Sequence, residues 1–187
     1  MKSVLYHGAA YSGRATSLIQ LFPPVATDGD ALSEQYWNRL AAGVPFRGSE
    51  VPETLRVAVL RVGNVIIADA VALLSSDYPP AVRVRNILAD LSAVVFVASS
   101  APERQEANAR ELDLLRNMLE YGGRSIDDTP VVFQLNHRDL SEAVPVAEMM
   151  AKLKSGRCAY HESIATQGVG VRETFMLAVT MAANMNL

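Results

Sequence analysis

Short apolar segments alternate along this chain with longer segments in which apolar residues recur at helical spacing. The continuous apolar run 93–98 is typical of a strand buried on both faces of a parallel sheet, and residues 130–135 are predicted to form another buried strand. Between them, a helix is predicted from Pro102 to about residue 119, where Gly122 and Gly123 end it. Strands that alternate with helices in this way predict an α/β fold with right-handed crossover connections.

The N-terminal part of the chain follows the same alternation. A strand is predicted at residues 4–6 and a helix at residues 13–21. The β-rich runs 55–62 and 65–74 are separated by Gly63 and Asn64, a two-residue connection typical of an antiparallel hairpin. Further helices are predicted at residues 82–90, 144–153 and 169–185, and a further strand at residues 158–165. The pattern therefore predicts a mixed, mostly parallel sheet with helices on both of its faces.

Composition excludes several classes of protein. The 187 residues are 50% hydrophobic and 20% charged, with a formal net charge of -3, which favours one folded domain over residues 1–187. The scattered Lys and Arg residues form no basic patch, so we expect neither nucleic-acid binding nor a polybasic membrane contact. The single cysteine, Cys158, cannot form an internal disulfide and fits a reducing compartment. Without a signal peptide or a long apolar stretch, we expect a cytoplasmic protein that does not insert into a membrane.

A possible phosphate-binding loop follows the first predicted strand. Residues 8–15, Gly-Ala-Ala-Tyr-Ser-Gly-Arg-Ala, have the glycine spacing of the P-loop pattern G-x-x-x-x-G-K-[ST]. Two glycines at this spacing let backbone N–H groups and a helix N-terminus face an anion. Arg14 occupies the lysine position, and Ala15 supplies no hydroxyl for Mg²⁺, while Thr16 points about 100° away on the helix. The candidate phosphate-loop residues are Gly8, Ser12, Gly13, Arg14, Ala15 and Thr16.

A candidate base-binding site follows two later strands. Asn136, His137, Arg138 and Asp139 resemble the guanine-reading motif N-K-x-D of Ras-like GTPases, with His137 in place of lysine. In that motif the aspartate accepts hydrogen bonds from guanine, and the asparagine ties the base loop to the phosphate loop. Ala165 lies in a third loop, where its backbone N–H is expected to meet the guanine O6 atom. Ordinary turns and helix caps would explain each loop by itself, but ligands of open α/β sheets bind at this edge of the strands.

These motifs and several flanking segments resemble the gliding-motility Ras-like GTPases of the MglA type. The segments that carry the resemblance are 94–100, 103–108 with Leu112, 136–140, 143–146 and 168–171. The resemblance covers most of residues 93–180 and the first strand, loop and helix, and it is poor between residues 23 and 90. It implies a three-layer Ras-like G-domain with a six-stranded sheet that binds GTP or GDP with Mg²⁺. It also implies a polarity switch whose regulator is a dimeric roadblock-fold GTPase-activating protein.

The chain lacks parts of that family's hydrolytic apparatus. Ala15 removes the P-loop hydroxyl, and the family's switch threonine aligns near Pro52, with Thr54 as a neighbour. Residues 74–77, Leu-Ser-Ser-Asp, stand where the family has a Pro-Gly-Gln turn. The leading hypothesis is therefore a pseudo-GTPase with at most weak guanine-nucleotide binding, negligible hydrolysis and no catalytic or metal-binding residue, which acts through protein partners. The expected partner is a roadblock-fold, MglB-like regulator or another polarity or motility protein.

Two alternatives stay open at this point. An active but slow GTPase switch would use Arg14 in the role of the lysine. A nucleotide-free interaction module would instead have its phosphate site filled by Tyr11 or by residues 75–80. The histidines lack paired ligand spacing, so no metal site is predicted, and Cys158 is interpreted as a buried thiol in a strand.

Overall fold

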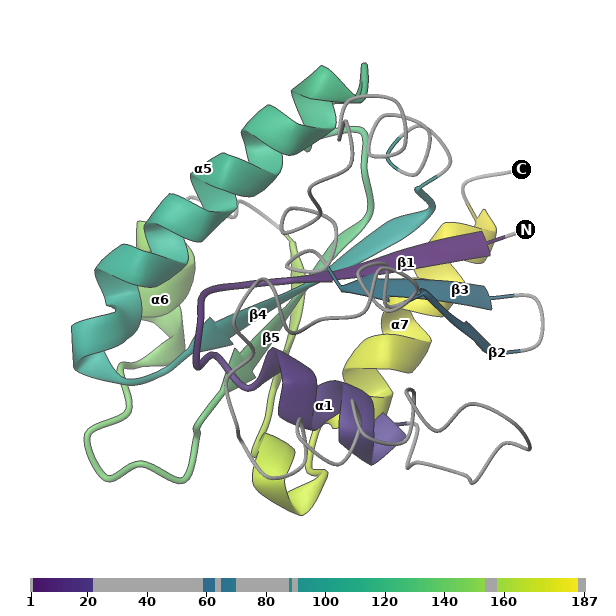
Figure 1. The fold of residues 1–187 in the computed structure, drawn as a ribbon. Helices are drawn as coiled ribbons and strands as arrows, with labels where there is room; N and C mark the ends of the chain where they lie inside the picture. Colours follow the sequence, from purple (N-terminus) through teal and green to yellow (C-terminus); the bar gives the residue numbers. More distant parts are fainter. Residues whose placement is uncertain are drawn as a thin grey trace, which may run out of the picture.

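The computed structural model describes residues 2–21, 59–62, 65–69, 88, 91–153 and 158–184. Within these residues the sheet has the strand order β2-β3-β1-β4-β5-β6 (Figure 1). The strands are β1 (Lys2–His7), β2 (Val59–Val62), β3 (Val65–Asp69), β4 (Ala93–Ser99), β5 (Val131–Asn136) and β6 (Ala159–Glu162). β2 runs antiparallel to β3, and the other pairings are parallel. The predicted α/β class, the hairpin and the mostly parallel sheet are confirmed.

Helices cover both faces of this sheet, which gives three layers (Figure 1). The helices are α1 (Arg14–Leu21), α5 (Gln105–Tyr121), α6 (Val146–Lys152) and α7 (Val171–Asn184), with short 3₁₀ turns η1 (Pro102–Arg104) and η2 (Ala165–Gln167). One core packs α5 and α6 against alternate residues of β4 and β5, among them Phe96 and Phe133. The opposite core packs α1 and α7 against the residues between them, such as Val95 and Val132. This alternation follows from the pleat, which points successive side chains to opposite faces.

The centre of the sheet aligns the loops of interest. Every residue of β4 and of β5 is buried, as expected for strands with helices on both faces. The register places Ser99 at the end of β4 beside Asn136 at the end of β5, and His7 at the end of β1 beside Phe96. Because these strands are parallel, their carboxyl ends meet at one edge of the sheet.

Some predicted boundaries are wrong. The strand predicted at residues 158–165 ends at Glu162, and Ala165 lies in the 3₁₀ turn η2. The helix predicted from Pro102 starts with the separate 3₁₀ turn η1. Cys158 precedes β6 and is only partly buried, and burial raises the pKa of its thiol. The predictions for residues 50–54, 74–77 and 75–80, and for the helix at 82–90 apart from Leu88, lie outside the described residues.

Candidate functional site

The loop between β1 and α1 is fitted closely against neighbouring strands. Gly8 has φ +153° and Gly13 has φ +94°, conformations that favour glycine. A Cβ atom on Gly8 would lie 2.2 Å from the carbonyl oxygen of Val97, and one on Gly13 would lie 2.0 Å from Nδ2 of Asn136. Both glycines therefore allow a close approach that another residue would block. Tyr11, between them, also has positive φ (62°), and its side chain is 76% exposed.

Arg14 turns back over the loop that precedes it. Its Nη1 atom donates to the carbonyl oxygen of Gly8 at 2.7 Å, so the guanidinium spans the loop from its last residue to its first. Ala15 and Thr16 lie in the first turn of α1, which begins at Arg14, and both are partly buried. The hydroxyl of Ser12 is buried and has no hydrogen-bond partner among the described residues. The loop thus holds a cation and a spare hydroxyl donor next to the N-terminus of α1, which suits an anionic ligand.

Asn136 links three loops through its side-chain amide. Nδ2 donates to the carbonyl oxygen of Ser12 at 2.8 Å, while Oδ1 accepts from the backbone N–H of Ala165 at 2.8 Å. Oδ1 also accepts from the hydroxyl of Ser163 at 3.1 Å. A carbonyl can only accept and a backbone N–H can only donate, so these partners fix which way the amide faces. The structure brings the predicted asparagine, phosphate loop and alanine loop together at one edge of the sheet.

The Ala165 N–H is already used within the protein. The sequence-based hypothesis directs this N–H to a guanine O6 atom, but here it donates to Asn136. A base carbonyl at this position would have to share the N–H or replace that bond. Asp139 is exposed after β5, where its carboxylate can accept hydrogen bonds from a ligand.

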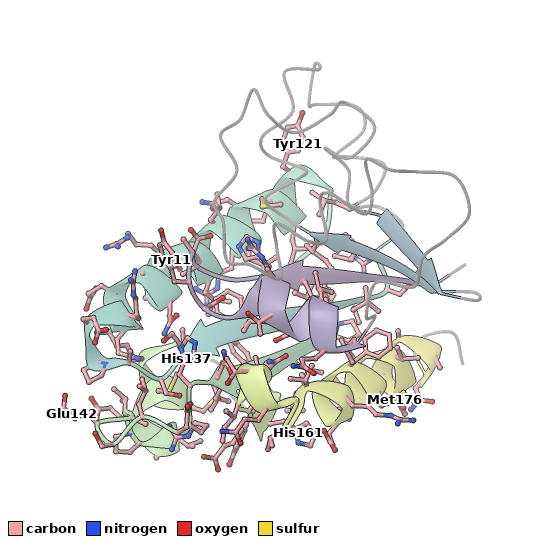
Figure 2. All side chains as sticks on the ribbon, turned by 60° about the horizontal axis from the view of Figure 1, so that its bottom comes forward. Tyr11, Tyr121, His137, Glu142, His161 and Met176 are labelled. Carbon is pink, nitrogen blue, oxygen red and sulfur yellow. The ribbon has the colours of Figure 1, made fainter. Side chains whose placement is uncertain are left out.

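His137 occupies a left-handed conformation beside the phosphate loop. Its φ is +65°, and its Nδ1 atom lies 2.8 Å from the hydroxyl of Ser99 at the end of β4. Partial burial lowers the pKa of His137, and the nearby Arg104 cation lowers it further, whereas Asp139 raises it. The Arg104 guanidinium lies 5.2 Å from the ring centre of Tyr11. Figure 2 shows Tyr11 and His137 at the same end of the sheet.

The sequence patterns did not predict the roles of two buried polar residues near this site. Gln134, inside β5, is fully buried, and its Nε2 atom donates to the hydroxyls of Ser17 at 2.7 Å and Ser163 at 3.1 Å. His7 is also buried, and its Nε2 atom lies 3.0 Å from the carbonyl oxygen of Glu111 on α5. In both cases a polar residue within an apolar strand indicated an unusual position. The hydrogen-bond partners could not be predicted, because they are distant in the sequence.

Metal-ligating side chains do not cluster within the described residues. These residues contain no group of three or more His, Cys, Asp or Glu side chains that could hold a metal ion. At the position where the P-loop pattern places a metal-binding hydroxyl, Ala15 presents a methyl group. None of the helices in the described parts of the chain has the length and apolar character needed to cross a membrane.

This chain resembles known proteins in its fold and, over part of its length, in its sequence. The fold is similar to that of the Arl6 (BBS3) small GTPase from Trypanosoma brucei with the bound nucleotide analogue GppNp. The TM-score is 0.58, with 20% identity over 98% of each chain. The fold is therefore that of the Ras-like small GTPases. The sequence is 42% identical over 88 residues to mutual gliding-motility protein MglA of Myxococcus xanthus (strain DK1622).

That match spans 47% of this chain and 45% of MglA, so it covers about half the length of the curated relative. No family model matches the chain. Over this half the chain is similar in sequence to MglA, and the resemblance to Ras-like GTPases of the MglA type is confirmed.

Proposed function

We propose that this protein is a pseudo-GTPase that holds GDP or GTP between its phosphate loop and the loops after β5 and β6. The observation that carries the proposal is the Asn136 amide, which bridges Ser12 of the phosphate loop and Ala165 of the candidate base loop. This bridge sets the spacing between a phosphate cradle and a base pocket before any ligand arrives. Asp139 is the proposed guanine-reading carboxylate, and Arg14 the proposed phosphate-binding cation.

We propose that hydrolysis is negligible because the metal contact is lost. In phosphoryl transfer, a bound Mg²⁺ ion neutralises charge on the phosphates, and positioned residues orient the attacking water. Ala15 supplies no oxygen for such an ion. The candidate replacements for the switch threonine and the Pro-Gly-Gln turn, at residues 50–54 and 74–77, lie outside the described residues.

Nucleotide analysis of the purified protein tests this proposal. The protein is denatured, any released nucleotide is identified by chromatography, and GTP, GDP and ATP are titrated with and without Mg²⁺. We expect guanine nucleotide binding that is nearly independent of Mg²⁺, without Mg²⁺-dependent phosphate release. Mg²⁺-dependent GTP turnover would instead establish the active but slow GTPase in which Arg14 takes the role of the lysine. No binding of any nucleotide would establish the nucleotide-free interaction module.

We further propose that the protein works as a single cytoplasmic domain through contacts with other proteins in polarity or motility regulation. The homology to MglA supports protein partners in general. A roadblock-fold, MglB-like protein is the proposed regulator, with another polarity or motility protein as the alternative. Co-purification of this chain with a roadblock-fold protein encoded in the same genome, at a defined stoichiometry, tests the assignment. Separate elution of the two proteins at micromolar concentration would count against that partner.

A further inference from the structure

Gln134 is a buried polar residue in the middle of an otherwise apolar strand. It lies between Phe133 and Leu135, both of which are buried in the core beneath α5. The Gln134 side chain instead faces α1, where it contacts the hydroxyls of Ser17 and Ser163. An apolar side chain would fill this position at lower desolvation cost, so packing alone does not account for a glutamine here.

The hydrogen bonds around Gln134 have one possible direction. Ser17 donates its hydroxyl proton to the carbonyl oxygen of Gly13 at 2.9 Å, and Ser163 donates its own to Asn136 Oδ1 at 3.1 Å. Each hydroxyl has a single proton, so only lone pairs remain for Gln134. The Gln134 amide must therefore present its NH₂ group, whose two protons match the two hydroxyls.

This orientation leaves the other end of the amide without a partner. Gln134 Oε1 is buried and makes no hydrogen bond within the described residues. Rotating the amide to bury Nε2 instead would place Oε1 against both hydroxyls and would draw their protons away from Gly13 and Asn136. The two serines thus hold the amide in the orientation that keeps the phosphate loop and Asn136 in place.

We infer that Gln134 is the positioning residue that couples the phosphate loop to the base loop, an inference that rests on the nucleotide-binding function proposed above. Through Ser17 it fixes the carbonyl of Gly13, and through Ser163 it fixes the amide of Asn136. The Gln134 side chain bonds to these two hydroxyls rather than to the phosphate-loop backbone or to the predicted base contacts. It acts by directing two hydroxyl protons toward the groups that do.

Two substitutions of similar shape separate this role from packing. Gln134→Met removes both donors, and Gln134→Glu replaces them with a carboxyl group that donates one proton when neutral and none when ionised. We expect either change to weaken GDP binding by about tenfold. A factor of this size corresponds to the loss of one net hydrogen bond that holds the empty site in its binding geometry. For Gln134→Glu the loss should grow as pH rises, a dependence that lost packing does not produce. Leu135→Met, next to it in β5 and on the opposite face, is the control and should bind GDP as the unmodified chain does.

A second readout does not depend on nucleotide. The backbone N–H of Ala165 donates to Asn136 Oδ1, so its ¹H chemical shift reports the Asn136 orientation in the nucleotide-free protein. We expect Gln134→Met to move this resonance and Leu135→Met to leave it in place. If the Met variant does not fold, Ser163→Ala removes the same link and should move the resonance in the same way.

The outcomes separate the two proposals. Failure of the unmodified chain to bind GDP would overturn the proposed function. The chemical shift of the Ala165 N–H in the Gln134 variants would still show whether Gln134 positions Asn136. An unchanged resonance in Gln134→Met, or in Ser163→Ala where the Met variant does not fold, would overturn the inference. GDP affinity in Gln134→Met equal to that of the unmodified chain would overturn it as well.

Discussion

The side-chain amide of Asn136 donates to the backbone carbonyl of Ser12 across 2.8 Å and so joins the end of β5 to the phosphate loop. The two residues are 124 positions apart in the sequence. Because Asn136 is fully buried, the bond is shielded from water, and loss of either partner would leave a buried polar group unsatisfied.

Removal of the Asn136 side chain should destabilise the fold as well as the site. Asn136→Ala removes the bonds to Ser12, Ser163 and Ala165 and leaves their polar groups buried. We expect the free energy of unfolding to fall by about 2–3 kcal/mol in urea denaturation. Asn117→Ala, on the exposed face of α5, is the control and should change it by less than about 0.5 kcal/mol. Equal effects of the two substitutions would contradict the bridging role of Asn136.

Gly13 should tolerate no side chain, for two separable reasons. Gly13→Ala introduces both an unfavourable φ and a Cβ atom against Asn136, whereas Gly123→Ala introduces only the unfavourable φ, +77°, in open space. We expect Gly123→Ala to lower the free energy of unfolding by about 1 kcal/mol. Gly13→Ala should lower it by about 3 kcal/mol or more. Thermal or urea unfolding of both variants measures the difference, which isolates the steric clash. A Gly13→Ala variant no less stable than Gly123→Ala would show that the loop can move away from Asn136.

Acid should destabilise the protein through His7. Burial lowers the pKa of His7 from 6.5 to about 4, a hydrogen bond to the Glu111 backbone opposes this, and the Arg14 cation lowers the pKa further. The unfolded chain therefore takes up a proton at a higher pH than the folded chain does, so stability is fully present above pH 6.5 and is lost as pH falls toward 4. We expect a loss of about 3 kcal/mol over this interval.

Urea denaturation at several pH values measures that loss. His7→Gln should remove most of the pH dependence, while His137→Gln should retain the contribution of His7. A stability profile in His7→Gln that falls as steeply as that of the unmodified chain would assign the acid sensitivity to other groups.

The guanine assignment predicts a change of base specificity. If Asp139 accepts hydrogen bonds from the guanine N1 and N2 groups, Asp139→Asn should shift the preference from GDP toward xanthosine diphosphate, which carries a carbonyl oxygen in place of the amino group. Competition titrations with both nucleotides measure the preference, and Asp128→Asn, an exposed change before β5, is the control. An unchanged preference for guanine would remove Asp139 from the base site.

Local sequence patterns predicted much of the fold because they report burial directly. The apolar run at residues 93–98 identified β4, whose residues are all buried between β1 and β5. Gly63 and Asn64 identified the antiparallel pairing of β2 with β3. The grouping of the phosphate loop with Asn136 followed from a general property of parallel sheets, whose strands end at a common edge.

The end of β6 could not be predicted in the same way. Residues 158–165 look like one strand, but β6 ends at Glu162, and although Ser163 still donates its N–H to Leu135 of β5, Ala165 donates its own to the side chain of Asn136 and begins the turn η2. Gly168 and Gly170, with φ near +73° and +72°, then turn the chain into α7. A hydrogen-bond partner on another strand decided this boundary.

The sequence by itself determined the α/β class, the loops that carry the candidate site and the loss of a metal-binding hydroxyl at Ala15. Each of these depends on residue type and on spacing between near neighbours. Only the tertiary structure decided that Gln134 meets Ser17 and Ser163, which are 117 and 29 positions away, and that the Ala165 N–H donates to Asn136. Hydrogen-bond direction depends on which groups the folded chain brings within about 3 Å, and no local pattern records those distances.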